Sequence, residues 1–379
     1  MDDSRVIDGW RADLFGSPPA RLTEGDDRLA ADAALRLVGE GAGILWRGDW
    51  HNARQLVDAL GRRLEAREKR NAARADPTLP AAFHRWRLAE ARRARQLGAI
   101  LVPVEAGWVV PLRRAPDLRA ACEQAFGTLD APCIAPLRAL VGAVGAFEWR
   151  RRGIELPVLG PNDDGEMARI HPHYGVFAPV RHEYLDLLAA APLPAASARG
   201  PNFDIGTGTG VIAALLARRG VGPIVATDDS ERALACAAEN LARLGVADRV
   251  ELLAVDGYPP GRAGLVVCNP PWLPGKAATL LEHGVFDPDS RMLSTFLEGL
   301  AAHLAPGGEG WLLMSDLAER LGLRAEGELV GRIAAAGLEV RGRDETRPRH
   351  KRSRDPDDPL APARGAERVS LWRLAPAAG

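Results

Sequence analysis

The second half of the chain alternates short apolar runs with amphipathic segments, and this order constrains the fold more than any other feature of the sequence. Strand-like runs occupy residues 200–207, 223–228, 250–255 and 265–269, and helical patterns at 211–219 and 231–244 separate the first three. Strands that alternate with helices in this way form βαβ units and a parallel sheet covered by helices on both faces. Further strands are expected at 311–315, 338–343 and 369–374. The sequence therefore predicts an α/β fold with a seven-stranded, doubly wound sheet.

The first part of the chain has a different character, because its pattern is mostly helical. Apolar residues recur at helical spacing in 28–38, 53–68, 82–97, 117–126 and 135–149. Two short apolar runs at 100–104 and 107–112 could pair as a hairpin. An arginine-rich stretch at 150–152 and a polar, proline-containing stretch at 157–165 mark a boundary. We expect a mainly helical N-terminal domain over 1–157, a candidate for substrate recognition, and a catalytic domain over 158–379.

Composition excludes several classes of protein. Lys and Arg number 49 against 50 Asp and Glu, which argues against a basic nucleic-acid coat and an acidic disordered chain. No apolar run reaches the ~18 residues of a membrane span, and the acidic start lacks the apolar core of a secretion signal. Cys122, Cys133, Cys236 and Cys268 are scattered, without metal-binding or disulfide spacing. We expect a cytoplasmic protein with no metal and no membrane partner.

A glycine-rich turn follows the first predicted strand of the second domain. Residues 204–210 read Asp-Ile-Gly-Thr-Gly-Thr-Gly, and glycines at such a turn let the backbone approach a ligand closely. A dinucleotide fingerprint would need a further glycine where this chain has Val211. The spacing therefore favours a nucleoside without a pyrophosphate and argues against a dehydrogenase.

Two acidic residues stand at the ends of the next two predicted strands. Asp228 is placed to accept hydrogen bonds from both hydroxyls of a ribose, and Asp229 is the weaker candidate beside it. The alternative is that these acids only cap the following helix. Asp256 is placed to bind an adenine amino group, and its alternative is a turn residue before Gly257.

The fourth predicted strand ends in Asn269-Pro270-Pro271-Trp272. With the glycine turn and the two acids, this order resembles the class I S-adenosylmethionine-dependent methyltransferases with their Rossmann-like sheet. It is most similar to the N-methylating branch, which includes release-factor glutamine methyltransferases and rRNA guanine-N2 methyltransferases. Residues 171–179 resemble the segment that crosses the methionine end of the cofactor in these enzymes. The resemblance implies S-adenosylmethionine as cofactor, held by Phe177, Pro179, Asp204, Gly206, Thr207, Gly208, Gly210, Asp228, Asp256 and Asn269. It implies Asn269, Pro270 and Trp272 as catalytic residues.

The chemistry of a planar nitrogen explains why such a motif is needed. The lone pair of an amide or base amino group is delocalised, so the nitrogen is a poor nucleophile until its N–H bonds are held. The Asn269 side-chain oxygen and the Pro270 carbonyl can each accept one N–H, and two prolines keep these acceptors rigid. Trp272 can stack on the flat group. No metal is required for the transfer.

The acceptor is less constrained than the reaction. Residues 204–213 look most like the turn of the release-factor glutamine methyltransferases, and this resemblance implies a protein glutamine in a translation component. A large N-terminal domain before the catalytic one also resembles the rRNA enzymes. Residues 51–119 carry 15 basic against 7 acidic side chains, which fits either a solvated helix face in an arginine-rich protein or a surface that binds RNA phosphates. An RNA base amino group (rRNA or tRNA) therefore stays an alternative. Tryptophan in place of the commoner Tyr or Phe leaves the acceptor open, and His283 is a further candidate contact. A hypothesis of another class is a non-catalytic RNA- or ribosome-binding factor.

Overall fold

The computed structural model describes residues 8–72, 78–276, 284–348 and 358–377. The chain divides into two compact units, Met1–Glu148 and Trp149–Gly379. His283 lies outside the described residues.

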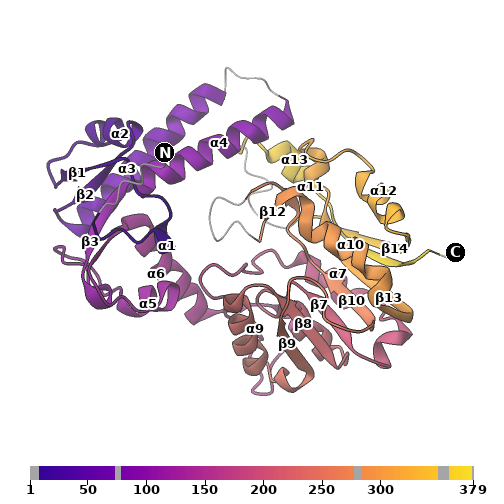
Figure 1. Ribbon diagram of the computed structural model, residues 1–379. Helices are drawn as coiled ribbons and strands as arrows, with labels where there is room; N and C mark the ends of the chain where they lie inside the picture. The colour runs from indigo at the N-terminus through magenta and orange to yellow at the C-terminus, as the bar shows by residue number, and fades with distance from the viewer. Residues whose placement is uncertain (1–7, 73–77, 277–283, 349–357, 378–379) are drawn as a thin grey trace. The chain divides into compact units, whose positions relative to one another are not determined.

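The second unit is built on a seven-stranded sheet in the order β14-β15-β13-β10-β7-β8-β9 (Figure 1). Its strands are β7 (Asn202–Ile205), β8 (Ile224–Asp228), β9 (Val250–Ala254), β10 (Ala263–Cys268), β13 (Leu304–Ser315), β14 (Leu338–Thr346) and β15 (Val369–Pro376). The first five of these are parallel, and β15 runs antiparallel to both β13 and β14. This confirms the predicted seven-stranded α/β sheet.

Helices cover both faces of this sheet, which explains why its central strands β7 and β10 are buried throughout. Leu265 and Val267 of β10 pack in the same core as α7 (Glu183–Ala190), α8 (Val211–Arg218) and α9 (Glu231–Arg243). Val266 and Cys268 of β10 face the opposite core, with α10 (Arg291–His303) and α12 (Glu328–Ala335). Successive strand residues point to opposite faces, so all six residues of β10 are buried.

The strand order reverses between β7 and β10. From β7 the chain passes to β8 on one side, while β10 pairs with the other edge of β7. In open α/β sheets such a reversal leaves a crevice beyond the carboxyl ends of the two strands. The glycine turn follows β7 and the Asn-Pro-Pro-Trp segment follows β10, so the fold brings these two motifs together.

Short elements complete the second unit. They are β5 (Ile154–Glu155), β6 (Arg169–Ile170), β11 (Leu273–Pro274), β12 (Phe286–Asp287), α11 (Leu317–Arg320) and α13 (Ala361–Ala366).

The first unit contains the expected helices and also a four-stranded sheet that the sequence analysis did not predict. Its elements are α1 (Ala12–Phe15), β1 (Arg21–Gly25), α2 (Ala31–Gly39), β2 (Ala42–Trp46), α3 (Trp50–Ala72), α4 (Leu79–Gly98), β3 (Ile100–Val104), α5 (Arg119–Phe126), β4 (Cys133–Pro136) and α6 (Leu137–Arg152), which continues past the boundary. The predicted hairpin was wrong, because β3 pairs with β2 and β4 rather than with 107–112. A single bridge joins Glu105 to Val109.

The cysteines are buried and none forms a disulfide. Burial raises the pKa of Cys122 to about 12 and that of Cys236 to about 11, so both remain thiols at neutral pH. Within the described residues, every helix is too short or too polar to cross a bilayer.

Gly210 begins α8 at a point where this helix passes close to α9. Its φ is +78°, and a Cβ there would lie 3.1 Å from both the Cα and the Cβ of Ala237. We expect Gly210→Ala to lower the free energy of unfolding by about 2–4 kcal/mol, from left-handed backbone strain plus displacement of α9. Gly220→Ala is the matched control, because Gly220 has φ +84° and no atom within 4 Å of an added Cβ. Urea denaturation measures both, and equal losses would show that close contact with α9 carries no cost.

Candidate active site

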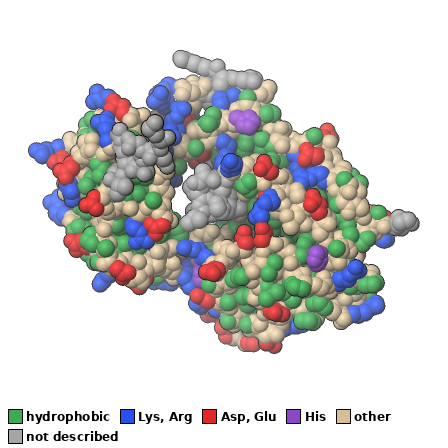
Figure 2. Space-filling model, viewed as in Figure 1, with side chains coloured by type: hydrophobic (Ala, Val, Ile, Leu, Met, Phe, Trp, Pro, Cys, Tyr) green, Lys and Arg blue, Asp and Glu red, His purple; other side chains and the backbone are tan. Residues whose placement is uncertain are grey.

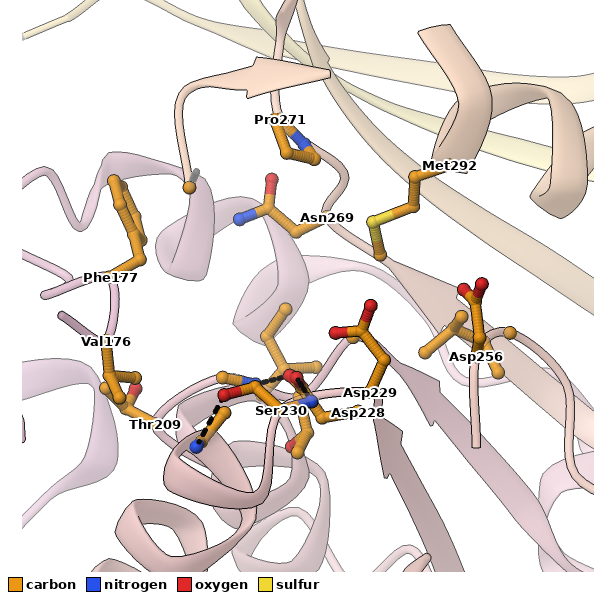
Figure 3. Close-up of a pocket in the computed structure, with 18 of the residues that line it drawn as sticks. Val176, Phe177, Thr209, Asp228, Asp229, Ser230, Asp256, Asn269, Pro271 and Met292 are labelled. Atoms are coloured by element: carbon orange, nitrogen blue, oxygen red, sulfur yellow. Dashed lines mark hydrogen bonds between the residues drawn. The ribbon is translucent and has the colours of Figure 1, made fainter. Parts of the chain in front are cut away.

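A cavity of about 340 Å³ lies beyond the carboxyl ends of the central strands. Its wall is formed by the turn after β7, the end of β8, the loop after β9, the segment after β10 and the first turns of α10. Figure 3 shows Asp228, Asp229 and Ser230 on one side of it and Asn269 and Pro271 on another. The cavity therefore joins three motifs that are far apart in sequence.

The glycine turn is supported by hydrogen bonds to the side chain of Asp204. This residue is fully buried in β7, and its Oδ2 accepts hydrogen bonds from Thr207 Oγ1 at 2.7 Å and from the Ala213 amide at 3.1 Å. Gly206, Thr207 and Gly208 line the cavity, whereas neither Asp204 nor Gly210 is among the described lining residues. The structure thus places Asp204 as a support for the turn.

The buried carboxyl of Asp204 makes stability depend on pH. Burial raises the pKa of Asp204 from 3.8 to about 7. Between these values the unfolded chain has lost this proton and the folded chain keeps it, so the free energy of unfolding falls as pH rises, by up to ~1.4 kcal/mol per pH unit. We expect Asp204→Asn to remove this slope, because an amide side chain does not titrate. The amide oxygen can still accept both hydrogen bonds, so the turn should keep its support. Urea unfolding of the two proteins across pH 4–8 measures the difference, and parallel curves would contradict it.

Two adjacent acids end β8 at the cavity wall. Asp228 Oδ2 accepts a hydrogen bond from the Gly208 amide at 2.9 Å, and its Oδ1 accepts one from the Ser230 amide at 3.0 Å. Burial raises the pKa of this carboxyl. The side chain that caps α9 is that of Ser230, whose Oγ accepts a hydrogen bond from the Ala233 amide at 3.3 Å. Each Asp228 oxygen keeps a lone pair for a ligand. Asp229 also lines the cavity and directs its carboxylate into it (Figure 3).

Asp256 follows β9 and lines the cavity, but its carboxylate already forms an ion pair with Arg291. Its Oδ2 lies 2.6 Å from Arg291 Nη1, and both side chains are exposed. An adenine amino group would therefore share this carboxylate with Arg291. Arg291 was not predicted as a site residue.

The segment 171–179 reaches the cavity through Gly175, Val176 and Phe177, whereas Pro179 is outside the described lining. The backbone of this segment is hydrogen-bonded to Asn240 of α9. The Asn240 Oδ1 accepts a hydrogen bond from the His171 amide at 2.8 Å, and the Asn240 Nδ2 donates to the Thr209 carbonyl at 3.0 Å. One buried side chain therefore joins this segment to the glycine turn.

The Asn-Pro-Pro-Trp segment presents Asn269 and Pro271 to the cavity, while Pro270 and Trp272 are absent from the described lining. The Trp272 indole N–H donates a hydrogen bond to Asn269 Oδ1 at 3.0 Å. The Arg181 guanidinium lies 5.3 Å from the centre of the indole ring. One ring face is thus occupied by a cation, which restricts the predicted stacking on a substrate to the other face.

Helix α10 supplies lining residues that the sequence analysis missed. Met292 lies against the glycine turn, because a Cβ on Gly206 would be 2.2 Å from its Cε. The Asp287 carboxylate accepts hydrogen bonds from the amides of Met292 and Leu293 and thereby caps the helix. The turn-forming Asp-Pro-Asp-Ser at 287–290, ahead of an amphipathic helix, could have located this helix start, although not its approach to the cavity.

The polar and apolar groups that line the cavity fit S-adenosylmethionine. Asp228 and Asp229 offer carboxylate oxygens to ribose hydroxyls and to a cation, and Val176, Val255 and Phe296 offer apolar contacts to a flat base. Gly208 leaves open space where a side chain would project. The volume suits a nucleoside-sized ligand. Within the described part of the chain, no group of three or more His, Cys, Asp or Glu could hold a metal ion.

Comparisons with known proteins find that part of this chain is similar to methyltransferases. Residues 168–320 match the model of the methyltransferase small domain. A release factor glutamine methyltransferase from Cereibacter sphaeroides is 38% identical over 150 residues, which cover 36% of this chain and 51% of that protein. A ribosomal protein L11 methyltransferase from Pelotomaculum thermopropionicum is 35% identical over 148 residues, which cover 38% of this chain and 40% of that protein.

A tRNA1(Val) (adenine(37)-N6)-methyltransferase from Bacteroides thetaiotaomicron is 32% identical over 131 residues, which cover 31% of this chain and 54% of that protein. The chain spans about half the length of the curated relatives it matches. The matched segment contains the glycine turn, both β8 acids and the Asn-Pro-Pro-Trp motif. Residues 168–320, which carry all three of these motifs, are therefore the part of this chain that is similar to the methyltransferase small domain.

Proposed function

We propose that this protein is an S-adenosylmethionine-dependent N-methyltransferase that acts on a planar nitrogen. The observation that carries the proposal is the position of Asn269, whose side chain lines the same cavity as the glycine turn and the acids of β8. A hydrogen-bonding amide at that place can hold the N–H of an acceptor beside a bound nucleoside cofactor.

The residues divide into cofactor-holding and acceptor-holding groups. Asp228 would bind the ribose hydroxyls, the glycine turn would lie against the nucleoside, and Val176 and Phe177 would cover it. When bound, S-adenosylmethionine supplies a methyl group on a positively charged sulfur. Asn269 Oδ1 would accept one acceptor N–H and the Pro270 carbonyl a second, which orients the nitrogen lone pair. Asp204 and Asn240 would act by keeping the turn and the segment 171–179 in place.

The favoured acceptor is a glutamine side chain of a protein in the translation machinery. Three of the relatives that the chain matches are release factor glutamine methyltransferases, with 34–39% identity over the matched residues. A primary amide carries the planar N–H₂ group that Asn269 and Pro270 are suited to hold. The N-terminal unit would then recognise the protein that carries the glutamine.

A second candidate, an RNA base amino group, is favoured by one observation. Exposed basic side chains gather on α3 and α4 of the first unit, namely Arg54, Arg62, Arg67, Lys69, Arg70, Arg92 and Arg95. Figure 2 shows blue side chains along the upper edge of this unit, where α3 and α4 lie in Figure 1. Such a surface can bind phosphates.

Two measurements test the proposal. Thermal unfolding with S-adenosylmethionine should show stabilisation that NAD does not give, and equal results with the two cofactors would overturn the proposed cofactor. The purified protein is then incubated with labelled S-adenosylmethionine and an extract from a strain that lacks it. Label removed by protease and resistant to RNase supports the glutamine reading, and the reverse supports an RNA base.

A further inference from the structure

The indole of Trp272 contacts the acceptor-binding residue directly. Its N–H donates a hydrogen bond to Asn269 Oδ1 at 3.0 Å, three residues back in the chain. The ring is half-buried and packs against the apolar cores on both sides of the sheet. Because Trp272 is outside the described cavity lining, its N–H reaches Asn269 from beside the cavity.

A charged network holds this indole in place. Arg181 lies over the ring, and its Nε and Nη2 donate hydrogen bonds to Glu183 Oε1 at 3.1 Å and to Glu367 Oε1 at 3.0 Å. The two carboxylate side chains are 4% and 1% exposed, so the arginine is fixed by buried partners. The Ser315 hydroxyl donates a further hydrogen bond to Glu367 at 2.6 Å. A cation over an indole draws charge from the ring and strengthens its N–H as a donor.

This hydrogen bond decides which end of the Asn269 amide is the oxygen and which is the nitrogen. A primary amide has an acceptor end and a donor end that differ little in shape, whereas an indole N–H can only donate. The amide oxygen must therefore turn toward Trp272, and Figure 3 shows the amide nitrogen directed to the side where Phe177 lies. Phenylalanine has no donor at all, and a tyrosine hydroxyl lies at the far end of its ring, so neither would supply this indole N–H.

We propose that Trp272 is a positioning residue: its indole N–H, backed by Arg181, fixes the orientation of the Asn269 amide. One lone pair of Oδ1 is then left for a single acceptor N–H, and the Nδ2 protons are presented to a hydrogen-bond acceptor on the substrate. The site is thereby matched to a nitrogen that has an acceptor atom beside it, as in a primary amide or an adenine. Ammonium and guanidinium groups offer only donors and do not match it. This inference rests on the proposed function for its catalytic consequence.

The first test measures the hydrogen bond itself, without any turnover. In an NMR spectrum of the full-length protein, the indole N–H signal of Trp272 is identified by its loss in Trp272→Phe. We expect this signal to move upfield in Asn269→Ala and to exchange faster with solvent. An unchanged signal would show that the bond is absent and would overturn the proposal, whether or not an acceptor has been found.

The second test measures the consequence for transfer. Trp272→Phe keeps the aromatic ring and loses the N–H, and we expect kcat to fall about tenfold with the KM for S-adenosylmethionine unchanged. Trp311→Phe is the matched control, because the Trp311 N–H donates to Glu309 at 3.0 Å and Arg219 lies 5.9 Å from its ring. It loses the same kinds of contact away from Asn269 and should keep the wild-type kcat.

The outcomes separate this inference from the proposed function. A wild-type kcat in Trp272→Phe, or an equal loss in the two variants, would overturn the positioning role and leave the methyltransferase proposal intact. A wild-type protein that neither binds S-adenosylmethionine nor transfers a methyl group would instead overturn the proposed function, while the NMR result would still decide the hydrogen bond.

Discussion

Asn269→Ala should bind S-adenosylmethionine with nearly wild-type affinity and transfer methyl groups about 100- to 1000-fold more slowly. The variant removes the oxygen that holds the acceptor N–H, and the loss of one such preorganised contact typically costs this much in kcat. Most of the cofactor wall is untouched, because the glycine turn and Asp228 belong to β7 and β8. Steady-state kinetics with a radiolabelled cofactor and calorimetric titration of the cofactor measure the two quantities separately.

Asn269→Asp is the matched comparison for this prediction. It keeps an oxygen that can accept both the Trp272 N–H and an acceptor N–H but loses the Nδ2 donor, so we expect an activity between those of Asn269→Ala and the wild type. A wild-type rate in Asn269→Ala would contradict the assigned role of this residue. A parallel loss of cofactor affinity would show that the residue acts mainly through the cofactor.

Asp228→Ala should weaken cofactor binding by at least about 100-fold. The carboxylate is expected to accept two charge-assisted hydrogen bonds from the ribose, each worth roughly 1.5–3 kcal/mol. The substitution also removes the acceptor of the Gly208 and Ser230 amides, which loosens the turn that faces the nucleoside. Calorimetric titration with S-adenosylmethionine and with S-adenosylhomocysteine measures the loss.

Asp229→Ala provides the control, because Asp229 has a similar position on the cavity wall but does not hold the glycine turn. We expect it to lose less than tenfold in affinity, in keeping with a more exposed charge. If Asp229→Ala loses more than Asp228→Ala, the ribose-binding acid is Asp229 and the assignment made from the strand ends is wrong.

The sheet of the second unit could be predicted because each strand carries its own evidence. Runs such as 265–268 are apolar throughout and stand between turn residues, which is typical of strands that helices cover on both faces. The chemistry-bearing residues follow the carboxyl ends of these strands, so their meeting at one edge follows from parallel order alone.

The sheet of the first unit was missed for a physical reason. Ala42–Trp46 is a fully buried five-residue strand, but a short apolar run next to a helix is also compatible with a buried helical turn. Its partners come from 21–25 and 100–104, and single-sequence periodicity says nothing about pairing over such separations. Long arginine-rich helices between the strands dominated the local pattern.

The contacts between individual side chains also could not be predicted from the sequence. That Asp256 pairs with Arg291, and that Met292 lies on the glycine turn, depends on how α10 returns to the sheet after a loop. The Trp272–Asn269 hydrogen bond spans three residues, yet its existence depends on the rotamers of both side chains. The motif indicated which residues gather, and packing decides which of them face the ligand.

The buried amide of Asn240 has a consequence for the entropy of ligand binding. It joins the backbone at His171 to that at Thr209, so the segment 171–179 and the glycine turn, which both contribute to the cavity wall, are ordered by one side chain when the protein folds. Conformational freedom that is lost during folding is not lost again when a ligand enters. We therefore expect the amides of these two segments to be protected from hydrogen exchange before any ligand is added, and the cofactor to enter a cavity whose shape is already set.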